Sequence, residues 1–297
     1  MPAFTFLGTA CGLPMADRFH ASILLEMEAG QRVLLDAGEP CSQRLQGLGV
    51  PFRSIAAVLI SHGHSDHVGG LPMFLQGAWL EPFRRKPVEP ETGKGITPAA
   101  RGSGTPTLPK RDGPLPIYLP RELIAPLRAW LEAVYLPDKL IGFPLEWHAW
   151  EDTAAGAATL VLPGGGELRV TTALTTHLDG LRQRIDPTTT ERFKPYSLAL
   201  ESGGWRVVYS ADLGAPTDLE PHFRDGRPVD ALICELAHFE PEALCDFLAG
   251  KPVARLWLTH LSVENAARAA EILALTRQRL PQIGEIAVMR DGMRVGF

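Results

Sequence analysis

Short apolar segments recur along the chain, each bounded by Gly, Pro or charged residues. They are four to seven residues long and rich in Val, Ile, Leu and aromatic residues. Segments of this length and composition are typical of β-strands. Strands are therefore predicted at 4–7, 22–25, 32–35, 55–60, 116–119, 168–174, 197–200, 205–209, 231–234, 254–258 and 285–289.

Helical patterns are fewer than strand patterns. Helix-type spacing and end signals predict helices at 69–81, 121–134, 240–249 and 262–280. Most connections between the strands are too short for helical crossovers, so mixed sheets with helices packed outside fit better than a doubly wound fold. The chain divides loosely into two strand-then-helix halves near 150–166, and we predict that 1–297 forms a single domain.

One segment interrupts this pattern. Residues 82–116 contain eight prolines and five glycines and have no apolar periodicity, so we expect an insertion outside the core. The insertion has seven basic and three acidic residues, a balance of +4, which leaves −9 on the rest of a chain whose net charge is −5. Such a basic arm could bind phosphate groups. The alternatives are a solvated insertion and a contact between two copies, so a homodimer is also a prediction.

Composition narrows the class of protein. Hydrophobic residues make up 45% and charged residues 21%, values that exclude a disordered chain or a coiled coil. No segment approaches the ~20 apolar residues of a membrane span. The four cysteines are too sparse for a disulfide framework, and the first residues lack a secretory pattern. We therefore expect a cytoplasmic protein with no membrane partner and no globally basic surface for nucleic acid.

The strongest chemical signal is the sequence Ser-His-Gly-His-Ser-Asp-His at 61–67, directly after the apolar run at 55–60. Its three imidazoles and one carboxylate suit Zn²⁺, Mn²⁺ or Fe. Gly63 is expected to allow the tight backbone path that aims these side chains together. Three further residues of ligand type end other strand-like runs: His177, Asp212 and His260. Four strands that deliver ligands to one rim would build a two-metal site there.

This pattern resembles the metallo-β-lactamase superfamily, with His-x-His-x-Asp-His at 62–67 and single His, Asp and His residues downstream. The segments 6–14, 34–39, 209–212, 233–235 and 258–262 resemble the branch that contains the transfer-RNA 3′-processing endonuclease RNase Z and related phosphodiesterases. The resemblance implies an α/β (α+β) fold, a four-layer αββα sandwich with two mixed β-sheets and the active site at the sheet edge.

The resemblance also implies a ligand set. The first metal would be held by His62, His64 and His177, the second by Asp66, His67 and His260, and both by Asp212. The cofactors would be two divalent ions, zinc or alternatively manganese or iron, which lower the pKa of a shared water. Asp66 could also orient or deprotonate that water. Asp36 is expected to support the histidine loop, with a strand-end cap as the alternative.

The chain departs from the family pattern at one point. In the transfer-RNA enzymes, a glutamate in the place of Glu235 works with a separate histidine upstream of the last ligand, but residues 240–258 contain no histidine. His238 lies three residues after Glu235. We predict that these two residues form a pair that protonates the leaving group or contacts phosphate. The alternative is a salt bridge at a strand end.

The predicted function is a binuclear metal-dependent hydrolase. We expect a phosphodiesterase that uses a metal-bridging hydroxide on RNA or on a small nucleotide or cyclic diester. A hydrolase of carboxylic esters, thioesters or lactones is the alternative, and a non-catalytic metal-binding protein is the third possibility. Residues 179–195 follow His177 and are expected to shape the pocket through their basic side chains, since arginine suits phosphate or carboxylate groups. These side chains are Arg182, Arg184, Arg192 and Lys194.

Overall fold

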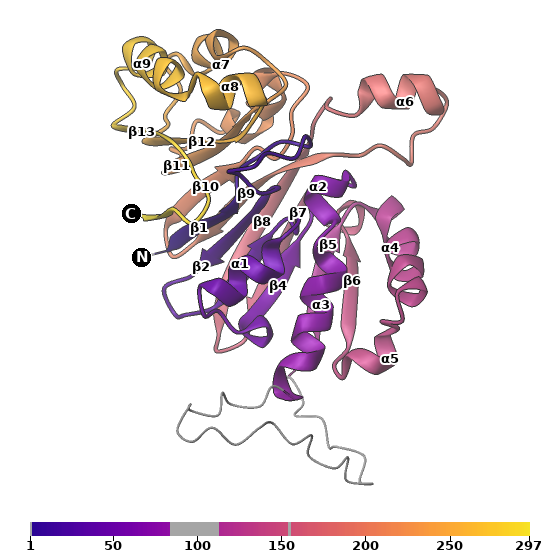
Figure 1. Ribbon diagram of the computed structural model, residues 1–297. Helices are drawn as coiled ribbons and strands as arrows, with labels where there is room; N and C mark the ends of the chain where they lie inside the picture. The colour runs from indigo at the N-terminus through magenta and orange to yellow at the C-terminus, as the bar shows by residue number, and fades with distance from the viewer. Residues whose placement is uncertain (1, 84–112, 154–155) are drawn as a thin grey trace, which may run out of the picture.

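The protein is described by a computed structural model, which covers residues 2–83, 113–153 and 156–297. Two seven-stranded sheets pack face to face (Figure 1). The first has the order β14 (Arg294–Gly296), β1 (Ala3–Gly8), β2 (Ser22–Glu26), β3 (Arg32–Leu35), β4 (Ile55–Leu59), β5 (Leu115–Leu119) and β6 (Leu145–Ala149). The second has the order β13 (Glu285–Val288), β12 (Arg255–Leu261), β11 (Ala231–Leu236), β10 (Trp205–Tyr209), β9 (Tyr196–Ser202), β8 (Gly166–Leu174) and β7 (Ala157–Leu162).

The two sheets repeat one pattern of pairing. In the first sheet β14, β1, β2 and β3 pair antiparallel, whereas β3, β4, β5 and β6 pair parallel. In the second sheet β7 to β10 pair antiparallel and β10 to β13 pair parallel. Both sheets are therefore mixed, as predicted. Because parallel strands end at the same edge, each half of the chain brings several strand ends to one rim.

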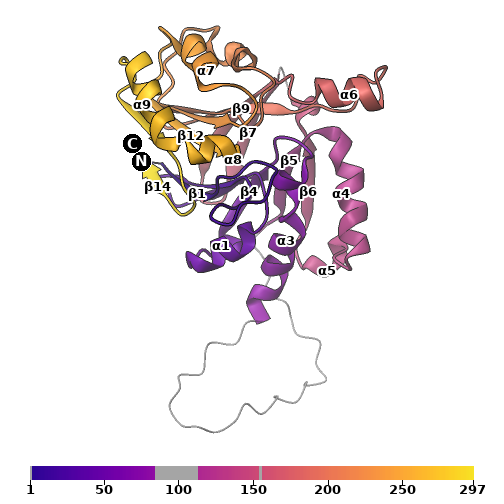
Figure 2. The same ribbon diagram turned by 45° about the horizontal axis from the view of Figure 1, so that its top comes forward.

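Helices cover the outer face of each sheet and complete the four layers (Figure 2). The first sheet carries α1 (Cys41–Gly47), α3 (Leu71–Leu80), α4 (Arg121–Ala133) and α5 (Asp138–Ile141). The second carries α7 (Pro241–Leu248), α8 (Val263–Ala267), α9 (Ala269–Arg279) and the 3₁₀ helix η5 (Pro216–Phe223). The remaining short helices are α2 (Ser65–Val68), α6 (Asp179–Ile185), η1 (Phe52–Ser54), η2 (Glu81–Phe83) and η3 (Trp150–Asp152). Over the described residues, no helix has the length and apolar character of a membrane span.

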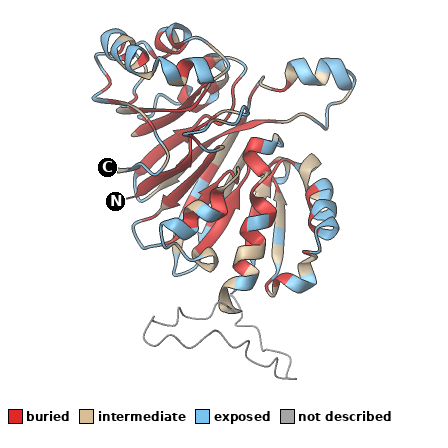
Figure 3. Cartoon of the chain, in the orientation of Figure 1, coloured by how far each residue is buried: buried red, intermediate tan, exposed pale blue. Residues whose placement is uncertain are grey.

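The buried residues form one core between the sheets and one beneath each helical layer (Figure 3). The core between the sheets combines aliphatic side chains with several aromatic rings. The Phe4 ring centroid lies 5.9 Å from that of Trp257 and 6.4 Å from that of Trp205. Phe4 comes from the first sheet and both tryptophans from the second, so these contacts join the two halves of the sandwich.

All eleven predicted strands are present within a few residues, but β6, β7 and β14 were not predicted. The sequences of these three strands are Leu-Glu-Trp-His-Ala, Ala-Ala-Thr-Leu-Val-Leu and Arg-Val-Gly. Each lies at a sheet edge, where one side of the strand lacks a neighbour and fewer apolar residues are needed. The single helix predicted at 262–280 is two helices, because Arg268 leaves the helical conformation between α8 and α9.

The predicted insertion at 82–116 falls largely outside the described residues, which omit 84–112. At its described ends, residues 82–83 belong to η2, and Leu115 and Pro116 already belong to β5. The predicted phosphate contact and dimer contact of this segment stay predictions.

A network of hydrogen bonds ties the loop after β1 to the residues before β14. Asp291 accepts hydrogen bonds from the Thr9 hydroxyl and from the Phe19 backbone N–H, both at 2.6 Å. The buried Arg18 guanidinium donates to Thr9 Oγ1 over 2.7 Å and to the Met289 carbonyl over 2.8 Å. Both ends of the loop after β1 are thereby fixed to residues 289–291.

His222 in η5 is expected to make the stability of the fold depend on pH. Its Nε2 atom lies 2.9 Å from the Ser197 hydroxyl oxygen, and burial, with the nearby Arg206, lowers its pKa to about 4. Between about pH 6.5 and pH 4 the unfolded chain binds a proton that the native protein does not. The stability from neutral His222 is therefore present above pH 6.5 and lost as the pH falls through this window.

The measurement compares wild type with His222→Gln, which does not titrate. Between pH 7 and pH 4.5, denaturant unfolding should show that wild type loses about 2 kcal/mol relative to the variant. Parallel pH profiles for the two proteins would contradict the assignment.

Candidate metal centre

Five segments deliver polar side chains to one rim of the sandwich. His62 and His64 follow β4, and Asp66 and His67 lie in α2. His177 follows β8, Asp212 follows β10, and His260 lies near the end of β12. The first four residues come from the first half of the chain and the other three from the second half.

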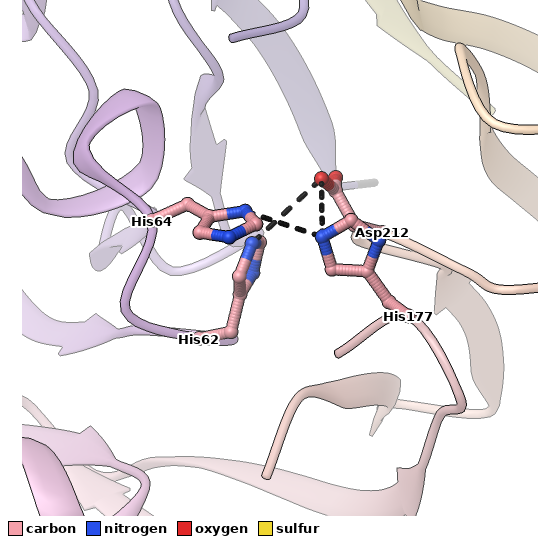
Figure 4. A group of neighbouring side chains, drawn as sticks. All are labelled: His62, His64, His177 and Asp212. Atoms are coloured by element: carbon pink, nitrogen blue, oxygen red, sulfur yellow. Dashed lines mark hydrogen bonds and ion pairs between the residues drawn. The ribbon is translucent and has the colours of Figure 1, made fainter. Parts of the chain in front are cut away.

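The first group of neighbouring side chains consists of His62, His64, His177 and Asp212 (Figure 4). The Nδ1 atom of His64 lies 3.2 Å from Nε2 of His177. Oδ2 of Asp212 lies 3.5 Å from Nε2 of His177 and 3.7 Å from Nε2 of His62. The candidate ligand atoms all lie within 4.8 Å of one another, close enough to surround one ion.

The second group consists of Asp66, His67, His260 and again Asp212. Oδ1 of Asp212 lies 3.2 Å from Nε2 of His67 and 3.2 Å from Nε2 of His260. Oδ2 of Asp66 lies 3.4 Å and 3.8 Å from the same two nitrogens. Asp212 therefore directs one carboxylate oxygen to each group. The structure brings together all seven residues that the sequence predicted as ligands.

The hydrogen bonding of these atoms fits metal ions. Nε2 of His62, His67 and His260 and Oδ1 of Asp212 are buried, and within the described part of the chain they have no hydrogen-bond partner. Buried polar atoms in native proteins are nearly always paired. Several unpaired nitrogen and oxygen donors that converge are the donor set expected for divalent ions such as Zn²⁺.

The protonation of three of the candidate ligand histidines agrees with this reading. Burial lowers the pKa of His62, of His64 and of His177, the last to about 4. These rings are therefore neutral at pH 7, which is the form that binds a metal. Burial alone would also lower the pKa of His67, but the carboxylates of Asp212 and Asp36 outweigh it and raise that pKa.

Asp36 lies behind the His67 ring and is fully buried. Its Oδ2 atom lies 2.7 Å from Nδ1 of His67, and it accepts hydrogen bonds from the Ser61 hydroxyl at 2.9 Å and the Tyr209 hydroxyl at 2.7 Å. Its Oδ1 atom accepts the Ser61 backbone N–H at 2.7 Å. This arrangement fits the predicted support of the histidine loop better than a strand-end cap, because it orients a candidate ligand.

Three non-glycine residues at the rim have left-handed backbone conformations. The φ angles are +54° at Asp36, +48° at Ala211 and +49° at His260. Such conformations cost free energy in non-glycine residues and cluster at functional sites. The backbone is strained where it turns these side chains, or the adjacent Asp212, toward the centre.

The role predicted for Gly63 needs a correction. Its φ angle does not lie in the left-handed region, so the backbone path does not demand glycine. A Cβ at this position would lie 2.6 Å from Cδ2 of Leu123 in α4. Any larger residue would require the Leu123 side chain to move, because α4 packs directly against the histidine loop.

Glu235 and His238 form the predicted pair beside the two groups. Nδ1 of His238 lies 2.8 Å from Oε1 of the buried Glu235. The backbone N–H groups of Leu213 and Ala237 also donate to this carboxylate, over 2.7 Å and 2.8 Å. The His238 ring centroid lies 4.5 Å from that of His177 and 6.0 Å from that of His260. The imidazole thus stands at the rim, held by a fixed carboxylate.

The segment 179–195 begins with α6, which projects from the body of the molecule in both views (Figures 1 and 2). Arg182 pairs with Asp179 at 3.0 Å, and Lys194 pairs with Glu191 at 3.3 Å. The guanidinium of Arg192 lies over the Phe193 ring. Two of the four basic side chains predicted to shape the pocket are therefore partly neutralised by acidic neighbours.

Asp218 was not predicted as a site residue, yet it joins two ligand-bearing loops. Its carboxylate accepts hydrogen bonds from the backbone N–H and hydroxyl of Thr176, at 3.0 Å and 3.0–3.1 Å. It also accepts the backbone N–H groups of Gly214 at 2.8 Å and Ala215 at 3.3 Å. Thr176 precedes His177, and Gly214 lies two residues after Asp212. In the sequence, Asp218 looks like an ordinary helix-start residue.

Replacing Asp218 with alanine is expected to weaken metal binding about 10- to 100-fold, because the loops that carry His177 and Asp212 lose their common acceptor. Competition with a chromophoric chelator measures the affinity. Asp225→Ala is the control, since that carboxylate contacts Arg206 and Arg227 away from the centre. Equal affinities in the two variants would show that Asp218 does not position the loops.

Comparison with known families identifies the superfamily of this chain. The model of the beta-lactamase superfamily domain matches residues 102–281, and that of the anti-Pycsar protein Apyc1 matches residues 2–87. Because the first match spans more than half of the chain, the protein belongs to the beta-lactamase superfamily.

Curated relatives are similar over a shorter stretch. Ribonuclease Z of Bradyrhizobium diazoefficiens is 44% identical over 72 residues, and Ribonuclease Z of Pyrobaculum calidifontis is 52% identical over 67 residues. These matches cover 24% and 23% of this chain, and the same shares of the relatives. The chain thus matches about a quarter of the length of these relatives.

Solved structures resemble the whole chain. The metallo-beta-lactamase fold protein YhfI from Bacillus subtilis has a TM-score of 0.68 at 18% identity and covers 99% of this chain and 98% of its own. The short form of human tRNase Z has a TM-score of 0.63 at 16% identity, with the same coverage. A diphosphatase of the PhnP family has a TM-score of 0.62 at 16% identity and covers 100% of this chain and 98% of its own. At these identities the comparisons show the metallo-β-lactamase fold.

Proposed function

We propose that the protein is a binuclear metal-dependent hydrolase of phosphodiesters, with RNA or a small nucleotide or cyclic diester as substrate. The observation that carries this proposal is the pair of side-chain groups that share Asp212. Relatives named Ribonuclease Z and the structural likeness to a tRNase Z support a phosphodiester as the substrate.

The residues divide into two ligand sets. His62, His64 and His177 would hold one ion, Asp66, His67 and His260 the other, and Asp212 both. The donor set of imidazole and carboxylate suits zinc, and also manganese or iron. Bound there, two divalent ions would supply Lewis acidity, which lowers the pKa of the attacking water and stabilises charge on phosphate.

The chain's own side chains would move the protons. Asp66 would accept a proton from the water whose oxygen forms the new bond to phosphorus. His238 would donate a proton to the leaving oxygen as the old phosphorus–oxygen bond breaks. Glu235 would hold the His238 ring by accepting its Nδ1–H, which leaves Nε2 for the donation.

Hydrolysis of two chromogenic substrates tests this function. The purified protein is treated with chelator, given Zn²⁺ or Mn²⁺, and assayed on bis-(p-nitrophenyl) phosphate and on p-nitrophenyl acetate. Metal-dependent turnover of the phosphodiester is expected. Turnover of the acetate alone would indicate a hydrolase of carboxylic esters, and metal binding without turnover of either would indicate a binding protein.

A further inference from the structure

The His67 ring contacts carboxylates at both of its nitrogens. In front, Nε2 lies 3.2 Å from Oδ1 of Asp212. Behind, Nδ1 lies 2.7 Å from Oδ2 of Asp36. The same Oδ2 atom accepts the Tyr209 hydroxyl at 2.7 Å, and Tyr209, Asp36 and His67 are all buried.

Tyr209 enters this cluster from the opposite sheet. Asp36 follows β3 and His67 lies in α2, both in the first half of the chain, whereas Tyr209 is the last residue of β10. Asp212 follows Tyr209 by three residues. The segment 209–212 therefore contacts His67 directly through Asp212. Through the Tyr209 hydroxyl it also bonds to Asp36, the carboxylate on the other side of the His67 ring.

We propose that Tyr209 is a positioning residue of the metal centre: its hydroxyl fixes the Asp36 carboxylate and, through it, the His67 ring. The inference rests on the proposed metal centre and deepens it. It makes retention of the ion held by Asp66, His67 and His260 depend on a hydrogen bond between the two sheets.

The physical reason is that one carboxylate oxygen has three polar partners. Oδ2 of Asp36 faces three groups, namely the Ser61 hydroxyl, the His67 Nδ1 and the Tyr209 hydroxyl. Loss of one donor leaves a buried carboxylate under-compensated, and it then turns toward its remaining partners. Because Asp36 sets the tautomer and orientation of His67, that turn misdirects Nε2.

The test compares two variants that each remove one buried phenol hydroxyl. Tyr209→Phe removes the bond to Asp36. The matched control is Tyr196→Phe, since Tyr196 also lies in the second sheet and its hydroxyl interacts electrostatically with Glu151, which is not next to a candidate ligand. Zn²⁺ affinity is measured by chelator competition, and the coordination of added Co²⁺ by its visible absorption.

In Tyr209→Phe, one of the two ions is expected to bind about 10- to 100-fold more weakly, with a changed Co²⁺ spectrum. In Tyr196→Phe, both affinities should stay within about twofold of wild type. In an Asp36→Asn background, Tyr209→Phe should add little, because the acceptor that it served is already altered.

Two results would overturn the inference while the proposed function stands. One is wild-type affinity and spectrum in Tyr209→Phe. The other is an equal loss of affinity in both variants, which would trace the effect to general weakening of the core. A wild-type protein that binds no divalent ion would instead remove the proposed metal centre itself.

Discussion

Replacing Asp212 with asparagine is expected to lower phosphodiester turnover about 10³-fold or more. Asp212 is the one residue shared by both groups, with Oδ2 toward His62 and His177 and Oδ1 toward His67 and His260. Asparagine keeps the size of the side chain and removes its charge. Each 1.36 kcal/mol of lost transition-state stabilisation lowers the rate tenfold. Bound metal ions contribute several kcal/mol to that stabilisation, so weaker metal binding is expected to cause a large loss of rate.

The measurement is kcat on bis-(p-nitrophenyl) phosphate together with metal content after dialysis. Asp225→Asn serves as the control, because it removes an exposed carboxylate of the same half of the chain. We expect the Asp212 variant to retain fewer than two ions and the control to retain two. A variant with two ions and wild-type kcat would show that the groups do not share this carboxylate in catalysis.

Replacing His238 with alanine is expected to cost about 10²- to 10⁴-fold in rate, but only for substrates with a poor leaving group. An alkoxide leaves slowly unless it is protonated, whereas a nitrophenolate leaves without help. The variant should therefore be slow on RNA or a cyclic nucleotide and close to wild type on bis-(p-nitrophenyl) phosphate.

Two comparisons separate proton donation from simple damage to the site. Metal content should be unchanged in His238→Ala, since neither candidate group includes His238. Glu235→Gln should give an intermediate loss with the same dependence on the leaving group, because glutamine still accepts the Nδ1–H. Equal losses on both kinds of substrate would mean that His238 binds phosphate or supports the loop instead.

The candidate ligands could be predicted from the sequence because four of them lie in one short motif and the others stand at the ends of apolar runs. The motif at 62–67 combines three histidines and an aspartate after an apolar strand, and His177, Asp212 and His260 each end or follow another strand. Strands buried on both faces are strongly apolar, so most of the two sheets could be predicted in the same way.

The other features of the fold and site depend on contacts between residues far apart in the sequence, which no local sequence pattern indicates. Asp218 joins loops that lie far apart in the sequence, and the bond from Tyr209 to Asp36 spans 173 residues. The edge strands β6 and β7 carry weak patterns because one side of each has no neighbouring strand. The close approach of Leu123 to Gly63 is visible only once α4 is placed.

The position of β14 has a consequence for how the protein is made on the ribosome. β14 pairs with β1, and Asp291 secures Thr9 and Phe19, so the first sheet is completed by residues 291–296. A nascent chain that has already presented His62, His64 and His67 must wait for more than two hundred further residues before that sheet closes. Completion of the first sheet is thereby delayed until residues 291–296 have been made.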